Sequence, residues 1–91
     1  MKITIDFKSV SSYADFYNQL QEKVKFPSYF GENLDALFDC ISGEVKMPLA
    51  IEFININGFQ SIAFSRLIKT MKELDEEVEG FTFQHRLKKS T

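Results

Sequence analysis

Three carboxylates stand close together in the segment YFGENLDALFD, residues 29–39. They are Glu32, Asp35 and Asp39, spaced three and four residues apart, and Glu44 adds a fourth acid before the next lysine. No lysine or arginine occurs between residues 26 and 45. Carboxylates in such a pattern indicate one of three kinds of chemistry, namely metal binding, acid–base catalysis, or contact with cations on another molecule.

The first two kinds of chemistry are disfavoured by the sequence. The spacing of the acids matches no calcium-binding loop, and no glycine-rich phosphate loop is present. Acid–base catalysis needs a cleft that separates the pKa values of two carboxyl groups, and neighbours on a convex helix form no cleft. His85 and Cys40, the only histidine and the only cysteine, lie far apart in the sequence. We therefore expect no catalytic residue, no metal site and no cofactor, and a protein that is not an enzyme.

Contact with cations of a partner is the remaining interpretation of the acids. In the simplest alternative they are ordinary surface charge, because exposed helix faces usually carry charge. However, Asp35 and Asp39 are four residues apart on one predicted helix, so they repel each other. The aromatic residues Tyr29 and Phe30 adjoin them in the preceding loop. Arginine and lysine groups that bind phosphate would bind these carboxylates by similar charge-assisted hydrogen bonds. The pattern therefore favours an acidic protein-binding face.

Length and composition indicate the class of protein. Ninety-one residues, of which 44% are hydrophobic and 26% charged, are typical of one globular domain, here residues 1–91. The net charge is only −2, but nine of the thirteen acids fall in two base-free stretches, residues 26–45 and 73–79. Acidic stretches repel phosphates, which argues against nucleic acid as a ligand. No apolar run is long enough to cross a membrane, and a single cysteine fits a reducing compartment. We expect a cytoplasmic protein.

Three segments have the patterns of β-strands. Residues 2–7 and 81–87 alternate between apolar and polar side chains, with Phe81, Phe83, His85 and Leu87 on one face of the second segment. The run LAIEFI, residues 49–54, is nearly continuous and suits a strand covered on both faces. Helical segments separate these strands, which predicts parallel pairing in a layered α/β domain.

Three helices are predicted between the strands. The first begins at Ser12, with Asp15 in a capping-box-like position, and is stopped by Pro27. The second begins at Asn33 and stops at Gly43, with an apolar face formed by Leu34, Leu37, Phe38 and Ile41. The third extends from residue 64 to 78 and is ended by Gly80. We expect Gly31 to allow a tight turn, NINGF at residues 55–59 to form a turn-rich break, and the tail at residues 88–91 to be frayed.

Three isolated residues have structural interpretations. Glu52 interrupts the apolar run 49–54, so its carboxylate needs hydrogen-bond partners, with a structural role expected first and a functional role second. Cys40 is interpreted as a semi-buried packing thiol, and His85 as a histidine of the core or of a sheet edge.

The segment YFGENLDALFDCISGEV, followed by a proline and an apolar strand, resembles the barstar family of intracellular inhibitors of secreted bacterial ribonucleases such as barnase. The likeness is long and ungapped from Tyr29 to Asp39 and extends more weakly over the whole chain. It implies an α/β fold with a three-stranded parallel sheet packed with about four helices. It also implies that the loop and helix at residues 29–43 fill the active site of a nuclease.

The resemblance implies a role for individual residues. Asp39 would take the place of a substrate phosphate, against arginines and the catalytic histidine of the enzyme. Asp35 would pair with a basic residue of the enzyme, and Tyr29 would pack on its histidine. The other implied partner-binding residues are Phe30, Gly31, Asn33, Leu34, Phe38, Ser42, Gly43 and Glu44, together with an acid of the last helix, either Asp75 or Glu76. Spacing back from Gly80 favours Asp75.

Two departures from the family pattern concern the identity of the partner. Phe38 and Glu44 stand where barstar has tryptophan. The implied partner is therefore a basic, extracellular-type ribonuclease or a nuclease toxin from a neighbouring cell, and the alternative is a module that binds another basic protein. The free inhibitor is expected to be a monomer.

Overall fold

The computed structural model describes residues 1–89 of the chain. In chain order the elements are β1 (Lys2–Asp6), a short 3-10 helix η1 (Phe7–Ser9), α1 (Tyr13–Lys23), α2 (Leu34–Gly43), β2 (Leu49–Ile56), α3 (Gly58–Ala63), α4 (Ser65–Glu77) and β3 (Phe81–Leu87). The tail does not begin to fray at Lys88, because its N–H donates to the carbonyl oxygen of Ile56 at 2.7 Å. The rest of that prediction falls partly on residues 90 and 91, which lie outside the described residues.

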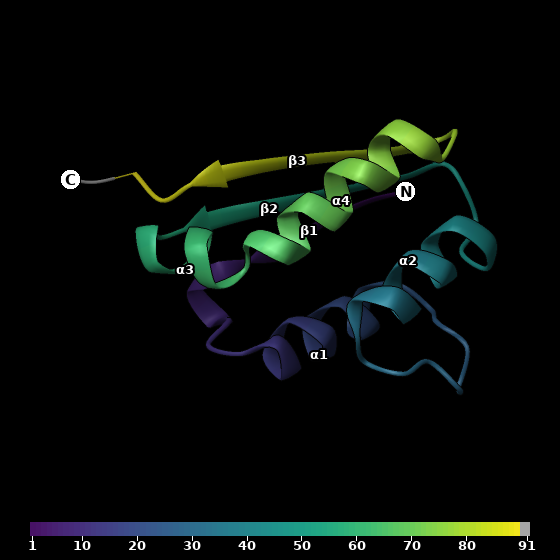
Figure 1. The fold of residues 1–91 in the computed structure, drawn as a ribbon, viewed down its shortest axis with the longest axis horizontal. Coiled ribbons are helices and arrows are strands. Elements are labelled where there is room, and N and C mark those ends of the chain that lie inside the picture. The colour runs from purple at the N-terminus through teal and green to yellow at the C-terminus, as the bar shows by residue number, and fades with distance from the viewer. Residues whose placement is uncertain (90–91) are drawn as a thin grey trace.

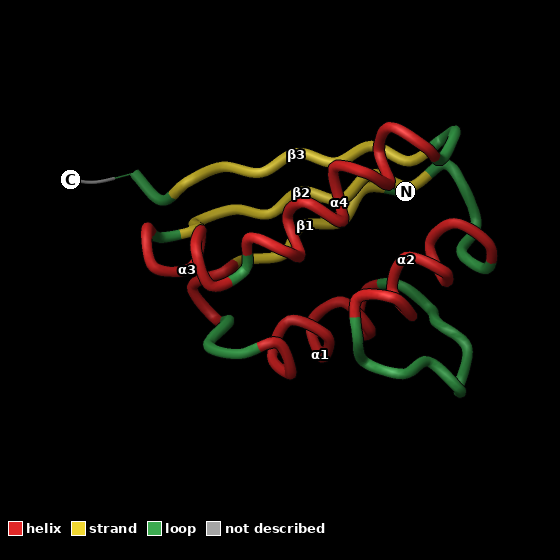
Figure 2. Tube along the Cα trace, in the orientation of Figure 1, coloured by secondary structure: helices red, strands yellow, loops and turns green. Residues whose placement is uncertain are grey.

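The three strands form one parallel sheet in the order β1-β2-β3, which confirms the predicted α/β class (Figure 1). Ile3 pairs with Ile51, and Ile51 pairs with Phe83. Helices make both crossovers between the strands, as parallel pairing requires. Figure 2 shows α1 and α2 between β1 and β2 along the chain, so the predicted partner-binding helix belongs to the first crossover.

The helices lie on one side of the sheet in Figure 1, so the prediction that both faces of residues 49–54 are covered is only partly correct. On the covered face, Leu49, Ile51 and Phe53 are buried. On the other face, Ala50 and Ile54 remain half-exposed. β2 is the central strand, so its backbone is paired on both edges by β1 and β3.

Phenylalanine rings make up much of the core between the sheet and the helices. The ring of Phe7 lies 4.9 Å from that of Phe53 and 5.3 Å from that of Phe64, measured between centroids. Phe16 packs against Phe53 edge to face at 5.5 Å. Each buried aromatic ring removes a large apolar area from water, which helps so short a chain to hold a stable core.

The predicted helix starts are confirmed by side-chain caps. The Oγ of Ser12 accepts from the N–H of Asp15 at 3.2 Å, and the Oδ1 of Asn33 accepts from the N–H of Ala36 at 2.8 Å. Each cap satisfies a backbone donor that has no partner inside its helix. The helix α2 ends at Gly43, as predicted, and α1 ends at Lys23, ahead of Pro27.

The helix α3 differs from the prediction of a turn-rich break at residues 55–59. Asn57 caps this helix, and its Oδ1 accepts from the N–H of Gln60 at 2.7 Å. The Oε1 of Gln60 accepts from the N–H of Asn57 at 3.1 Å in return, which completes a capping box. The buried amide of Gln60 also donates to the carbonyl oxygens of Phe7 and Val10. These bonds fix α3 against the end of β1.

Gly80 occupies the turn between α4 and β3 rather than the end of the helix itself, which is at Glu77. Its φ of +90° lies in the left-handed region, where side chains with a Cβ are strained. A Cβ at this position would also lie 3.1 Å from the Cβ of Met47. The turn between α4 and β3 therefore requires glycine.

The carboxylate of Glu52 has a partner, as predicted, whereas Cys40 is buried rather than semi-buried. Glu52 is 9% exposed on the central strand, and its Oε2 lies 3.0 Å from Nη2 of Arg86 on β3. Cys40 is 5% exposed and packs on the inner side of α2, so it is more deeply buried than predicted. His85 is half-buried on β3, a strand at the edge of the sheet.

Candidate partner-binding site

The helix α2 presents different chemistry on its two faces. Leu37, Cys40 and Ile41 are buried against the core, while Asp35 and Asp39 are exposed. The Asn33 cap and the buried face hold the backbone of the helix in place. The two carboxylates are therefore displayed on a helix whose position is fixed before any partner binds.

The loop before α2 is anchored by aromatic packing. The ring of Phe30 stacks on that of Phe26 at 4.7 Å and meets Tyr17 edge to face at 5.8 Å. The predicted contact residue Phe30 is thus half-buried and serves as an anchor of the loop. Gly31 does not adopt a left-handed φ, although its carbonyl oxygen accepts from the N–H of Asn33 at 2.6 Å in a tight bend.

Tyr29 and Glu44, which the sequence places at opposite ends of the predicted site, come together in the fold. Tyr29 is 74% exposed, the most exposed aromatic residue on this side. The negative charge of Glu44 raises the pKa of Tyr29 above its ordinary value, because it disfavours a second negative charge nearby. The phenol and the carboxylate therefore form one continuous surface next to the C-terminal end of α2.

Asp35 and Asp39 have no intramolecular counter-ion in the fold. Within residues 1–89 the one ion pair is that of Glu52 with Arg86, which lies on the sheet. Arg66 and Lys69 of α4 do line a groove of about 530 Å³ together with Asp35, but neither base lies within 4 Å of its carboxylate. The acids of α2 therefore face solvent as unpaired charges, with two bases at the edge of the surface.

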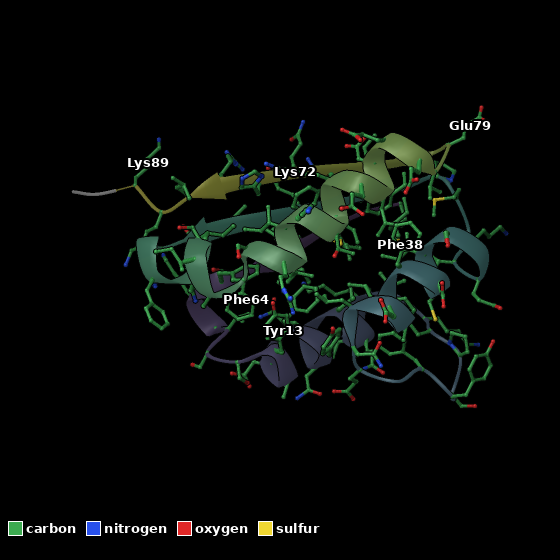
Figure 3. All side chains as sticks on the ribbon, viewed as in Figure 1. Tyr13, Phe38, Phe64, Lys72, Glu79 and Lys89 are labelled. Atoms are coloured by element: carbon green, nitrogen blue, oxygen red, sulfur yellow. The ribbon has the colours of Figure 1, made fainter. Side chains whose placement is uncertain are left out.

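A second groove, of about 490 Å³, lies beside the C-terminal half of α2. Phe38 and Ser42 line it from α2, and Glu77 and Glu79 line it from the end of α4 and the following turn. Figure 3 shows the ring of Phe38 between the two helices, with Glu79 at the same end of the molecule. The hydroxyl of Ser42 donates to the carbonyl oxygen of Phe38 at 2.7 Å, so a partner would find Ser42 as an acceptor.

The acids predicted from the last helix do not line the grooves beside α2. The Oδ2 of Asp75 accepts from the N–H of Phe83 at 2.8 Å, which directs this carboxylate towards β3. Glu76 is exposed and lines neither groove. The acids of α4 that do line them are Glu73 and Glu77. Contact of Asp75 or Glu76 with a partner stays a prediction.

Sequence reasoning missed the contributions of Arg66, Lys69, Glu73 and Glu77. These residues recur at helical spacing along one flank of the apolar stripe of α4, so periodicity alone could have grouped them. It could not show that this flank faces α2, because the packing of two helices from different crossovers is a non-local feature. The remaining predicted residues Leu34 and Gly43 lie where expected, at the ends of α2.

Two further observations concern the described residues. None of the helices within residues 1–89 combines the length and the apolar composition that a membrane span needs. The same residues contain no cluster of three histidine, cysteine or acidic side chains arranged to hold a metal ion.

Comparison with known proteins agrees with this geometry. The model of the family described as "Barstar (barnase inhibitor)" matches residues 1–88. The chain belongs to the barstar family. The three-stranded parallel sheet and its helices are consistent with this family.

One curated relative is a protein of Bacillus subtilis strain 168 named "Putative ribonuclease inhibitor YrdF". It is 33% identical to the chain over 81 residues, which covers 86% of this chain and 89% of the relative. The similarity therefore extends over most of the chain and is not confined to α2.

Proposed function

We propose that this barstar-family chain is an inhibitor of a bacterial ribonuclease and blocks the active site of that enzyme with α2 and the preceding loop. The observation that carries the proposal is the exposed position of Asp39 on a capped, core-anchored helix, with no cation of the described chain beside it. A ribonuclease active site binds phosphates with cationic side chains, and those cations can hydrogen-bond to carboxylates in the same way. The family match and the name of the B. subtilis relative support a nuclease as the partner.

In the proposed complex, Asp39 replaces a substrate phosphate at the centre of the interface. Asp35 pairs with a basic residue at the side of the cleft, and Tyr29 packs on the catalytic histidine. Because the loop and helix are already ordered in the free inhibitor, little conformational entropy is lost on binding. The inhibitor acts as a monomer in the cytoplasm, by steric and electrostatic blockade, without turnover of its own.

The target we propose is a nuclease whose active-site rim differs from that of barnase. Phe38 stands where barstar has tryptophan and keeps an aromatic ring in the groove while removing an N–H donor. Glu44 also replaces a tryptophan and adds a negative charge beside Tyr29. A nuclease toxin delivered by a neighbouring cell, with an additional base opposite Glu44, fits these changes, and the chain would then serve as an immunity protein.

The substitution Asp39→Ala tests the proposed function. Ribonuclease activity is titrated with wild type and variant against several basic extracellular ribonucleases and the nuclease encoded nearest to the gene. We expect inhibition of one of these enzymes by wild type, and a loss of at least about 2 kcal/mol of binding free energy in the variant, as for a central hot spot. Unfolding by urea should show equal or slightly higher stability, because a self-repelling charge is removed.

Glu22→Ala is the matched control, because Glu22 is also an exposed helical acid but lies on α1. The Glu22→Ala variant should inhibit the ribonuclease as strongly as wild type does. Equal inhibition by wild type and Asp39→Ala would show that Asp39 does not take the place of a phosphate.

A further inference from the structure

A cavity of about 670 Å³ lies where the parallel strands end, away from α2. Lys8 follows β1, Asn55 and Asn57 lie at the end of β2, and Lys88 follows β3, and all four side chains line the cavity. Its volume falls within the range of roughly 300–1,000 Å³ typical of small-ligand sites. Ligands of α/β proteins usually bind at this carboxyl edge of the sheet.

Lysine side chains gather at this edge. A second hollow of about 420 Å³ adjoins the cavity through Lys8, Asn55 and Lys88, and it adds Arg86 and Lys89. The Nη2 of Arg86 lies 3.0 Å from the Oε2 of Glu52, so the charge of Arg86 is already paired. None of the three lysines makes an ion pair within the described part of the chain. The edge therefore offers three ammonium groups to an anion.

Two acids near this edge, Asp6 and Asp15, already accept hydrogen bonds within the chain. The Oδ1 of Asp6 accepts from the N–H of Lys8 at 2.9 Å and from Nδ2 of Asn55 at 3.1 Å. These bonds hold the pKa of Asp6 below its ordinary value. The Oδ2 of Asp15 accepts from the N–H of Ser11 at 2.9 Å. Neither carboxylate lies within 4 Å of a lysine ammonium, although the charge of Lys8 also contributes to the lowered pKa of Asp6.

Aromatic rings also line the cavity. Phe59 of α3 is 80% exposed although it is a large apolar residue, and it lines the cavity. Tyr13 lines it from the first turn of α1, with its ring fixed on Phe64 at 4.8 Å, as Figure 3 shows. An exposed ring beside lysines is the combination with which proteins stack a base and hold the adjoining phosphate.

We propose that this edge binds a nucleotide unit, either as a free nucleoside phosphate or as part of an RNA strand. Lys8 and Lys88 contact the phosphate, Phe59 stacks on the base, and the amides of Asn55 and Asn57 hydrogen-bond to the base or the ribose. The Oδ1 of Asn57 is used to cap α3, so its Nδ2 is the group that meets the ligand.

The site is separate from the acidic face of α2. In Figure 3, Lys89 lies at the opposite end of the molecule from Phe38 and Glu79. The acidic stretches 26–45 and 73–79, which argue against a nucleic-acid ligand in the sequence, both lie towards the α2 end (Figure 1). That argument therefore applies to the α2 face and not to the lysine-lined edge.

Backbone amide NMR of the ¹⁵N-labelled full chain tests the proposal, with AMP, ribose 5-phosphate and hexaadenylate as probes. We expect AMP, hexaadenylate or both to shift the amides of residues 8, 13, 55–60 and 88, and to bind more tightly than ribose 5-phosphate. The double variant Lys8→Glu/Lys88→Glu should lose about tenfold or more in affinity, because phosphate contacts dominate such binding. Phe59→Ser should bind AMP no better than ribose 5-phosphate.

Lys25→Glu is the control for the change of net charge, because Lys25 is exposed in the loop after α1. It should leave the shifts at the strand ends unchanged. Binding of hexaadenylate alone would identify RNA as the source of the unit, and binding of AMP would identify a free nucleotide as sufficient. Three results would overturn the proposal: no shifts at these residues with either nucleotide probe, equal affinity for ribose 5-phosphate, or unchanged affinity in the double variant.

Discussion

Asp39 and Tyr17 are two polar side chains that depart from the usual pairing of polar groups, one on the surface and one in the core. Asp39 carries an exposed charge in mid-helix with no counter-ion among the described residues. Tyr17 is 2% exposed, and its hydroxyl makes no hydrogen bond within the described chain. The proposed cationic partner would account for the first departure. The second carries a cost in stability, because a buried polar atom has lost its bonds to water.

Replacement of Tyr17 by phenylalanine should therefore stabilise the protein. We expect a gain of about 1 kcal/mol near neutral pH, since the rings are similar in shape and an unsatisfied hydroxyl is removed. Burial raises the pKa of Tyr17 to about 12, against 10.0 for an ordinary tyrosine. Between these values the unfolded chain releases a proton that the folded protein keeps, so the stability of wild type falls as the pH rises.

The gain from Tyr17→Phe should thus grow above pH 10. Urea unfolding of both proteins at neutral pH and near pH 11 measures it. A difference in stability that stays constant with pH would show that Tyr17 ionises normally in the fold, and a destabilised variant would show that its hydroxyl has a partner.

At the level of elements, the sequence predicts what is encoded locally. Ser12 and Asn33 mark helix starts because their side chains cap nearby N–H groups, and period-two patterns mark β1 and β3. α3 was missed although Asn57 and Gln60 have capping-box spacing, because an Asn-Gly pair is more typical of a turn. The bases that α4 brings beside Asp35 were not predictable, because no local pattern tells which helix packs against which.

Substitution of Gly80 tests whether the turn between α4 and β3 requires glycine, and substitution of Gly58 is the matched control. Gly80→Ala should lower the free energy of unfolding by about 1–2 kcal/mol, because an alanine is strained at this φ and its Cβ crowds Met47. Gly58→Ala places a Cβ in open space at the start of α3 and should be neutral or stabilising by up to about 1 kcal/mol. Urea unfolding compares the two, and an equal effect of both substitutions would contradict a special role for the turn at Gly80.

Charge is distributed unevenly over the molecule, although its net charge is only −2. Acids are exposed on α2 and at the end of α4, and lysines line the hollow where the strands end. Glu79 and Lys89 mark these two ends in Figure 3. Such a molecule turns its acidic end towards a cationic partner as the two approach. The charge distribution therefore favours fast association in one orientation.

Association with the nuclease should accordingly slow as salt is added. Stopped-flow measurements between about 10 mM and 1 M ionic strength should show the association rate falling by at least roughly tenfold, because the Debye length shrinks from about 30 to 3 Å. At low ionic strength the double variant Asp35→Asn/Asp39→Asn should associate more slowly than wild type. Its association rate should also fall less steeply as salt is added. A flat response of wild type would exclude electrostatic steering.

The parallel sheet also has a consequence for how the chain is made. Ile3 of β1 has no strand to pair with until Ile51 has been synthesised, and all of α1 and α2 lie between them. Non-local pairing of this kind is slow and forms only after the intervening loop has closed. The acidic helix is therefore translated before β2 and before α4, the helix that packs against it. A nascent chain that stops short of β2 would carry the recognition residues without the rigid surface that displays them.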